Sequence, residues 1–324
     1  MRLRKPVRGR RSERLRRVWF DLLFWDTFQN PTEAGGPTMF WLILVSLAWA
    51  PSPGLISEYL AGAHVDPALV SFVRVTLAFL VLAPFFRPAG LRAKEMFVLA
   101  LIGAVQFGIM YVAYTTALTI LASYMVAVLT IVTPFFVCLL DDLWERRWRA
   151  WPWLAAGLAI AGAAVIQLSQ PLTAASWHGI LLVQLSNLCF ALGQVAYRRW
   201  RKARKNIADA HVFALLYVGA IVVTLPIAAP TFHTLPDLGA RAWGVLIFLG
   251  VIGSGVGFFL WNYGAARTSA GVLAVMNNAK IPLMVACSLL FFDKPADLRR
   301  LAVGGMLIVL AMVLAEWAAR RRTE

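Results

Sequence analysis

Ten apolar runs, each long enough to cross a membrane as a helix, constrain this chain more than any other feature. They lie at about 40–60, 68–86, 96–117, 119–140, 151–169, 178–197, 211–230, 242–262, 270–292 and 301–318. About 20 apolar residues span the hydrocarbon core of a bilayer. A spanning segment in lipid must satisfy its own backbone hydrogen bonds, which a helix does within itself. The sequence therefore predicts an all-α polytopic membrane protein with ten transmembrane helices.

The distribution of lysine and arginine predicts the orientation. Of these 31 residues, 25 fall in the tails and loops of one side, four fall on the other side, and two lie inside the runs. Because cytoplasmic loops are enriched in Lys and Arg, both termini are expected in the cytoplasm, with the protein in the inner (plasma) membrane. The same distribution accounts for the net charge of +15 without nucleic acid as a partner.

Residues 1–38 differ from the rest of the chain, because they carry nine Lys or Arg residues and no apolar run of the signal-peptide type. Three interpretations are open. The segment is a basic cytoplasmic tail attracted to anionic lipid, or it binds nucleic acid, or it is not made because translation starts at Met39. A short cytoplasmic tail is expected at 319–324.

The two halves of the chain repeat one pattern. Pro134 and Pro282 each follow a tyrosine by 19 or 20 residues, and each is followed by an acidic loop and a glycine-containing last run. Because five spans are an odd number, the halves must insert in opposite orientations, which predicts inverted five-helix repeats at 39–169 and 178–318. Such repeats are typical of carriers with a site near the midplane. A membrane receptor or a lipid-handling enzyme does not need them.

Polar side chains inside the runs indicate a substrate site, since they are costly in hydrocarbon unless they face a cavity or a partner. The expected substrate-binding residues are Arg74, Tyr111, Tyr114, Gln184, Asn187, Gln194, Trp261, Asn277, Asn278 and Lys280, with Pro134 and Pro282 as hinges. Alternatives remain open. The amides can serve as hydrogen bonds between helices, Trp261 can belong to an interfacial belt, and Arg74 can pair with Glu58.

No constellation typical of catalysis or metal binding occurs in the sequence. The three cysteines fall inside apolar runs, and the four histidines are scattered. Asp141, Asp142 and Glu145 lie beside arginines, where we expect a solvated cytoplasmic loop. The sequence thus predicts a transporter of a small anionic metabolite that is not an enzyme and needs neither a cofactor nor a metal.

The spans, the tails and the tyrosine–proline–acid pattern resemble the EamA-type members of the drug/metabolite transporter superfamily. Between residues 39 and 317, short strings are similar to bacterial biotin transporters of the carboxylate/amino acid/amine transporter group. These strings are 58–62 (EYLAG), 64–66 (HVD), 74–75 (RV), 181–187 (LLVQLSN), 261–265 (WNYGA), 270–271 (AG) and 276–278 (MNN). The resemblance implies biotin uptake by alternating access. The alternative is an exporter of amino acids, other metabolites or drugs with the same fold.

Biotin also fits these residue types, because it combines a carboxylate with a ureido ring. Arg74 is expected to bind the carboxylate, since its planar guanidinium gives a two-point contact and it lies in a matched string. Lys280 is expected to have a secondary role in setting the potential of the cavity. The amides would bind the ureido group, and Trp261 would cover the apolar ring.

Overall fold

The computed structural model describes residues 37–60, 65–88, 90–121, 123–167, 176–291 and 297–321. The basic tail, apart from its last two residues, and the Asp293 loop lie outside these ranges. Within them the chain is helical and forms no strand, as expected for apolar segments that must satisfy their backbone hydrogen bonds in lipid.

The helical elements follow one another through the described ranges. They are α3 (Pro37–Trp49), α4 (Ser52–Leu55), η1 (Ile56–Leu60), α5 (Pro67–Leu82), η2 (Ala83–Phe85), α6 (Ala93–Gly103), η3 (Ala104–Ile109), α7 (Met110–Ile120), α8 (Ser123–Thr130), α9 (Thr133–Glu145), α10 (Ala150–Gln167), α11 (Trp177–Ala203), α12 (Asp209–Val212), α13 (Ala214–Ala228), η4 (Ala229–Asp237), α14 (Ala240–Ile247), η5 (Phe248–Gly257), α15 (Phe258–Arg267), α16 (Ala270–Phe291) and α17 (Leu298–Arg320). The elements η1, η3 and η5 are π-helical, and η2 and η4 are 3₁₀-helical.

Among the described residues, six continuous helical segments are long and apolar enough to cross a membrane. They are Pro67–Phe85, Ala93–Ile120, Trp177–Ala203, Asp209–Asp237, Ala240–Arg267 and Leu298–Arg320, and shorter apolar helices lie at Phe40–Trp49 and Ala150–Ile166. The chain is therefore a multi-pass membrane protein. The predicted span at 119–140 differs from a continuous helix, because α8 and α9 are separated by a turn at 131–132.

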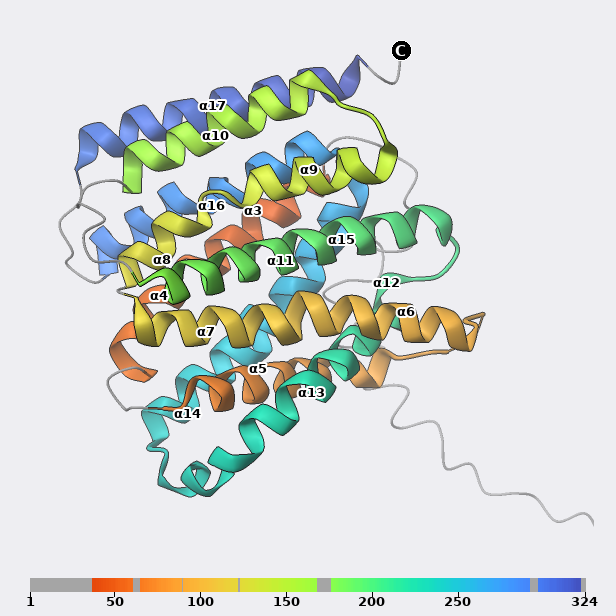
Figure 1. Ribbon diagram of the computed structural model, residues 1–324, viewed down its shortest axis with the longest axis vertical. Coiled ribbons are helices and arrows are strands. Elements are labelled where there is room, and N and C mark those ends of the chain that lie inside the picture. The colour runs from red at the N-terminus through yellow and green to blue at the C-terminus, as the bar shows by residue number, and fades with distance from the viewer. Residues whose placement is uncertain are drawn as a thin grey trace, which may run out of the picture. The chain divides into compact units, whose positions relative to one another are not determined.

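The central helix of the bundle is α11, which packs against α7, α9 and α15. On one side of it, α9 and α16 pack against α10, which pairs with α17. On the other side, α5 packs against α13 and η5 (Figure 1). Helices from both halves of the chain thus alternate through the bundle, so a site beside α11 is built from both halves.

The helices α10 and α17 lie side by side (Figure 1), and two glycines let their backbones approach closely. A Cβ atom built on Gly162 would lie 2.6 Å from the carbonyl oxygen of Gly304. Small residues let helix backbones approach in lipid, where packing replaces the hydrophobic effect as the driving force for association. The outer face of α17 is apolar and exposed, as expected for a lipid-facing helix.

We predict that Gly162→Ala destabilises the protein by roughly 1–3 kcal/mol, because the added methyl group meets a backbone carbonyl that cannot rotate away. The matched control is Gly157→Ala on the same helix, where nothing lies within 4 Å of the added methyl group. Because alanine is the better helix former, the control should be neutral or stabilising. Thermal unfolding in detergent measures both, and equal melting temperatures would contradict the prediction.

Candidate substrate cavity

A cavity of about 170 Å³ lies among the helices and is lined by residues from both halves of the chain. Its lining residues are Trp49, Ser52, Ile56, Arg74, Met110, Tyr111, Tyr114, Leu118, Thr130, Thr133, Ser186, Asn187, Phe190, Phe258, Lys280 and Ile281. Most of the lining is apolar, with a few convergent polar groups, which is the usual composition of a small-molecule site.

Arg74 of α5 is held in the cavity wall by neutral groups. Its Nη2 donates to Tyr111 Oη at 2.7 Å, and its Nε donates to Ser254 Oγ at 3.2 Å. The two hydroxyl oxygens lie 2.7 Å apart, and the guanidinium carbon lies 4.3 Å from the centre of the Tyr111 ring. Hydroxyl groups orient the guanidinium without cancelling its charge, so Arg74 remains cationic toward the cavity. The alternative pairing with Glu58 involves a side chain outside the described part of the protein.

Ser254 is positioned by the π-helical stretch η5. Two carbonyls of this stretch accept hydrogen bonds from side chains: Trp49 Nε1 donates to Gly253 O at 2.8 Å, and Tyr217 Oη donates to Ser254 O at 2.5 Å. Irregular turns of this kind are frequent at functional sites. The hydrogen bonds from α3 and α13 fix the turn that presents Ser254 to Arg74.

Lys280 of α16 lies near the aromatic side of the cavity. Its Nζ is 5.8 Å from the centre of the Trp49 ring and 5.9 Å from that of Phe190, at the outer limit of a cation–π contact. Within the described ranges, neither Lys280 nor Arg74 forms an ion pair with a carboxylate. The cavity therefore contains two cationic groups and, among its lining residues, no acidic one.

The break between α8 and α9 forms another wall, since Thr130 and Thr133 on its two sides both line the cavity. Pro134 is the second residue of α9 and has no N–H to donate to the preceding turn. The carbonyl of Thr130 accepts instead from Thr133 Oγ1 at 2.7 Å. Backbone carbonyls at membrane depth need such partners because no lipid atom can supply them.

Amide side chains from two other helices bond to the neighbouring carbonyls of the break. Asn187 of α11 donates to Leu129 O at 2.9 Å, and Gln184, one turn earlier, donates to the same oxygen at 3.3 Å. Asn278 of α16 donates to Ile131 O at 2.9 Å. Three predicted site residues thus donate hydrogen bonds to backbone carbonyls at the break in the helix. Of these three residues, Asn187 also lines the cavity.

Gln194, Asn277 and Trp261 form a second group of hydrogen bonds outside the cavity lining. Trp261 Nε1 and Asn277 Nδ2 both donate to Gln194 Oε1, at 3.1 and 3.2 Å. All three side chains are at most 1% exposed. They hold α11, α15 and α16 together about one helical turn beyond Phe190, so Trp261 does not belong to an interfacial belt.

The structure divides the ten predicted binding residues into two groups. Those that line the cavity are Arg74, Tyr111, Tyr114, Asn187 and Lys280. Those that bond between helices around it are Gln184, Gln194, Trp261, Asn277 and Asn278. Pro134 lies at a helix break, whereas Pro282 lies inside a continuous α16.

Several lining residues escaped the sequence analysis. Thr133 could have been found, because a hydroxyl directly before an intramembrane proline can bond to the carbonyl that the proline leaves free. Trp49, Phe190 and Phe258 could not, since aromatic residues occur throughout the apolar runs.

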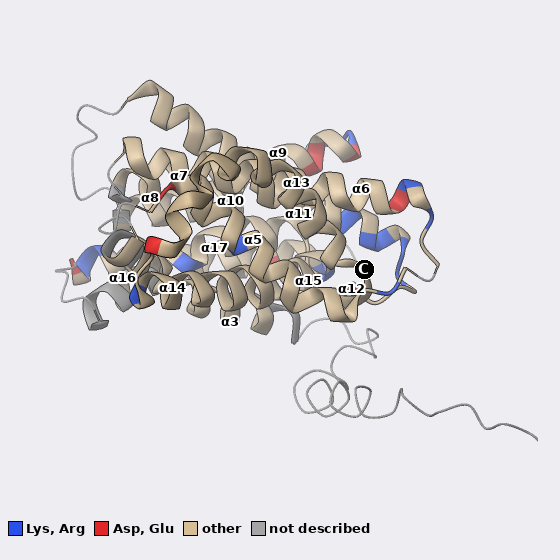
Figure 2. Ribbon diagram, turned by 90° about the horizontal axis from the view of Figure 1, so that it is seen from below, with Lys and Arg blue, Asp and Glu red and all other residues tan. Residues whose placement is uncertain are grey.

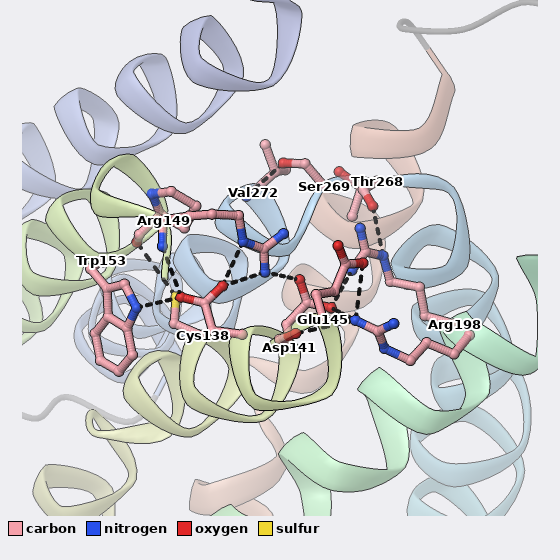
Figure 3. Close-up of polar contacts among 12 residues, drawn as sticks. Cys138, Asp141, Glu145, Arg149, Trp153, Arg198, Thr268, Ser269 and Val272 are labelled. Carbon is pink, nitrogen blue, oxygen red and sulfur yellow. Dashed lines mark hydrogen bonds and ion pairs between the residues drawn. The ribbon is translucent and has the colours of Figure 1, made fainter. Parts of the chain in front are cut away.

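Asp141, at the end of α9, is the centre of an ionic network (Figure 3). Arg198 and Arg199 of α11 lie 3.1 and 2.9 Å from its carboxylate, and Arg149, just before α10, also bonds to it. The Asp141 carboxylate is fully buried, so the expectation of a solvated position was wrong for Asp141, whereas Glu145 is exposed as expected. The physical reason is tertiary, since arginines distant in sequence enclose the acid. Burial raises the pKa of Asp141, but Arg198 and Arg149 outweigh that effect and hold it below its usual range.

Asp142 extends this network from α9 to Arg149 and to Trp153 of α10. Its Oδ1 lies 2.5 Å from a nitrogen of Arg149, and its Oδ2 accepts from Trp153 Nε1 at 2.7 Å. Like Asp141, it is buried rather than solvated. The network therefore joins the ends of α9 and α11 to the start of α10.

A third buried acid, Asp209, lies at the same end of α11. Asp209 accepts from Tyr197 Oη at 2.6 Å and pairs with Arg201 at 3.1 Å and Arg267 at 2.8 Å. Charged residues gather at this end of the helices in Figure 2. Three regions therefore follow one another along roughly 20 Å of α11. The cavity comes first, the hydrogen bonds of Gln194 come next, and the ionic clusters come last.

A helical bundle whose cavity lies among membrane-spanning segments from both halves of the chain, with ionic clusters beyond one end, is the architecture of a membrane transporter. The model of the EamA-like transporter family matches residues 36–168 and again 177–317. The chain belongs to this family. That membership agrees with the expectation of a transporter rather than an enzyme.

Individual relatives and a solved structure are also similar to the chain. It is 40% identical over 277 residues to a "Probable biotin transporter" of Pseudomonas aeruginosa, covering 85% of this chain and 96% of the relative. It is 36% identical over 287 residues to the "Biotin transporter" of Escherichia coli K12, covering 87% and 95%. A crystal structure matches its fold with a TM-score of 0.70 at 19% identity, covering 88% of this chain and 98% of the other.

We predict that Asp141→Asn destabilises the protein by roughly 3–5 kcal/mol, because it removes the central carboxylate of a buried ion cluster and leaves the buried Arg198 without its counter-charge. Arg149 keeps Asp142 as a partner, and Arg199 keeps Glu145. The control is Glu316→Gln, which breaks a pair with Arg320 at 3.9 Å whose arginine is 84% exposed. That change should stay within about 0.5 kcal/mol. Thermal unfolding in detergent compares the two, and an Asp141→Asn protein that melts with the control would refute the prediction.

Proposed function

We propose that this protein takes up biotin across the inner membrane by alternating access. The observation that carries the proposal is the cavity, which presents two cationic groups and a carboxamide within an apolar wall. Relatives named as biotin transporters, similar over nearly their whole length, support biotin as the substrate.

The chemistry of the cavity matches the parts of biotin one by one. Arg74 supplies a charged fork for the carboxylate, and Lys280 adds a second positive charge to the cavity. The Asn187 carboxamide both donates and accepts, as the ureido group requires. Trp49 and Phe190 give the apolar ring and chain a surface to contact.

We further propose ten membrane helices in two inverted repeats, 39–169 and 178–318, with both termini in the cytoplasm. Support comes from the two consecutive matches to the family model and from helices that overlap each predicted apolar run. In this orientation the cavity lies toward the outer side, and the ionic clusters of Asp141 and Asp209 close the cytoplasmic side.

Uptake of labelled biotin by cells that lack their own importer tests the proposed function. Cells that produce the protein should accumulate label in excess of cells with an empty vector, and unlabelled biotin should compete. An exporter with the same fold predicts the reverse, since preloaded cells would lose label faster. Absence of any biotin-dependent flux from a protein that reaches the membrane would refute both directions.

Variants of the two cavity cations test the binding assignment. Arg74→Ala should nearly abolish biotin uptake at normal membrane abundance, because the carboxylate loses its fork, and Lys280→Met should be milder. Arg74→Lys keeps the charge but loses the planar contact, so it should raise KM by roughly tenfold, about 1.4 kcal/mol. Uptake and membrane abundance are measured together. Normal uptake by Arg74→Ala would eliminate the assignment.

Thiol labelling of intact cells tests the orientation. In a variant without native cysteines, a cysteine at the exposed position of Asp237 should react with an impermeant maleimide added from outside. A cysteine at the exposed position of Lys202 should react only after the cells are permeabilised. The opposite pattern would reverse the orientation inferred from the charge distribution.

A further inference from the structure

Asn187 contacts both the cavity and the break between α8 and α9. One N–H of its carboxamide donates to Leu129 O at 2.9 Å, and the other donates to Gln184 Oε1 at 3.2 Å. Its Oδ1 lies 3.3 Å from Thr133 Oγ1, whose proton can go either to Asn187 or to the Thr130 carbonyl. Both N–H groups of Asn187 are therefore in use, and a ligand acceptor must displace one of these bonds.

The helix that begins at this break ends in the ionic network. Thr133, the first residue of α9, lines the cavity, and Asp141 lies eight residues later, about 12 Å along the same helix. Because a helix moves largely as a rigid rod, its tilt is set where it begins. A change of tilt at the turn at 131–132 would therefore move Asp141, at the far end of α9, relative to Arg198 and Arg199.

We propose that Asn187 couples substrate binding to the movement of α9. A substrate amide-like group that bonds to the Asn187 carboxamide withdraws it from the Leu129 carbonyl, and α9 then tilts so that the Asp141 network opens. This inference rests on the proposed function for its substrate. It goes beyond that function because it names the residue through which a substrate in the cavity causes the Asp141 network to open.

The exchange of partners is feasible because Leu129 O has a second donor. Gln184 Nε2 lies 3.3 Å from this oxygen, so the carbonyl keeps a partner within the protein when Asn187 turns to the substrate. A ligand shifts a conformational equilibrium only through contacts that differ between the two states. The bond between the substrate and Asn187 is such a contact, since Asn187 can make it only when its own bond to Leu129 O is lost.

A native cysteine can report the opening. Cys138 lies on α9 between the break and Asp141. It is 1% exposed in this structure, in which the Asp141 network is intact and which we call the closed arrangement. In the full-length protein with Cys189→Ala and Cys287→Ala, reconstituted in nanodiscs, the rate at which Cys138 reacts with a small maleimide is measured with and without biotin. Binding of labelled biotin to the same samples is measured in parallel, so that every comparison is made at saturation.

Saturating biotin should accelerate the reaction of Cys138 in this background by about tenfold, a typical coupling between two sites. In Asn187→Ala the reaction without biotin should already be fast, and biotin should add little even when it is bound. The maximal rate of uptake should fall by an order of magnitude or more, because the protein no longer distinguishes the occupied from the empty state.

Gln184→Ala is the matched control, because Gln184 donates to the same carbonyl but does not line the cavity. It should loosen the break slightly and keep the acceleration by biotin. The Asn187→Ala variant can instead show a raised KM, an intact maximal rate of uptake and an intact acceleration by biotin of the reaction of Cys138. That result would show that Asn187 only binds the substrate, and it would overturn the coupling. Normal wild-type uptake without any effect of biotin on Cys138 would also overturn it, whereas failure of the proposed function would appear as absent wild-type uptake.

Discussion

A backbone carbonyl in hydrocarbon must find a donor within the protein, and the cavity of this protein depends on that requirement. Where the helical pattern is interrupted, at the α8–α9 turn and in η5, carbonyls accept from the side chains of Asn187, Gln184, Trp49 and Tyr217. These donors converge from different helices onto two irregular points, and the cavity lies between those points. The polar wall of the site is therefore also the means by which a discontinuous backbone is tolerated at membrane depth.

The charged groups of the cavity and those of the Asp141 network have opposite surroundings. In the cavity, the hydrogen-bond partners of Arg74 among the described residues are hydroxyl groups, which leave its charge available. Beyond Gln194 and Asn277, Asp141 is paired with arginines of two segments, so its charge is neutralised within the protein. The cavity therefore suits an anionic ligand, and in the proposed transport cycle the ion pairs at the other end close the cytoplasmic side. α9 belongs to both ends, which makes it the element most able to connect them.

The sequence predicted the helical class and the cationic character of the cavity, because both follow from residue type and local periodicity. Arg74 and Asn187 were found because a polar side chain inside an apolar run is costly unless it faces a cavity or a partner. The burial of Asp141 was missed, because it depends on arginines some 57 residues away in the chain. The same limit applies to Gln194 and Trp261, whose positions also depend on tertiary packing. The sequence pattern of amides on one helical face is the same whether that face lines a cavity or contacts another helix.

The uncompensated cations of the cavity also make the protein sensitive to voltage. Among the described residues that line it, Arg74 and Lys280 meet no carboxylate, so a bound monoanion leaves the cavity with less positive charge than when it is empty. A unit charge that crosses the whole membrane field changes its energy by about 2.3 kcal/mol per 100 mV. If the protein works as proposed, its empty and its loaded forms therefore respond differently to the resting potential. An inside-negative potential would act on the conformational return of the empty protein as well as on the arrival of the proposed anionic substrate.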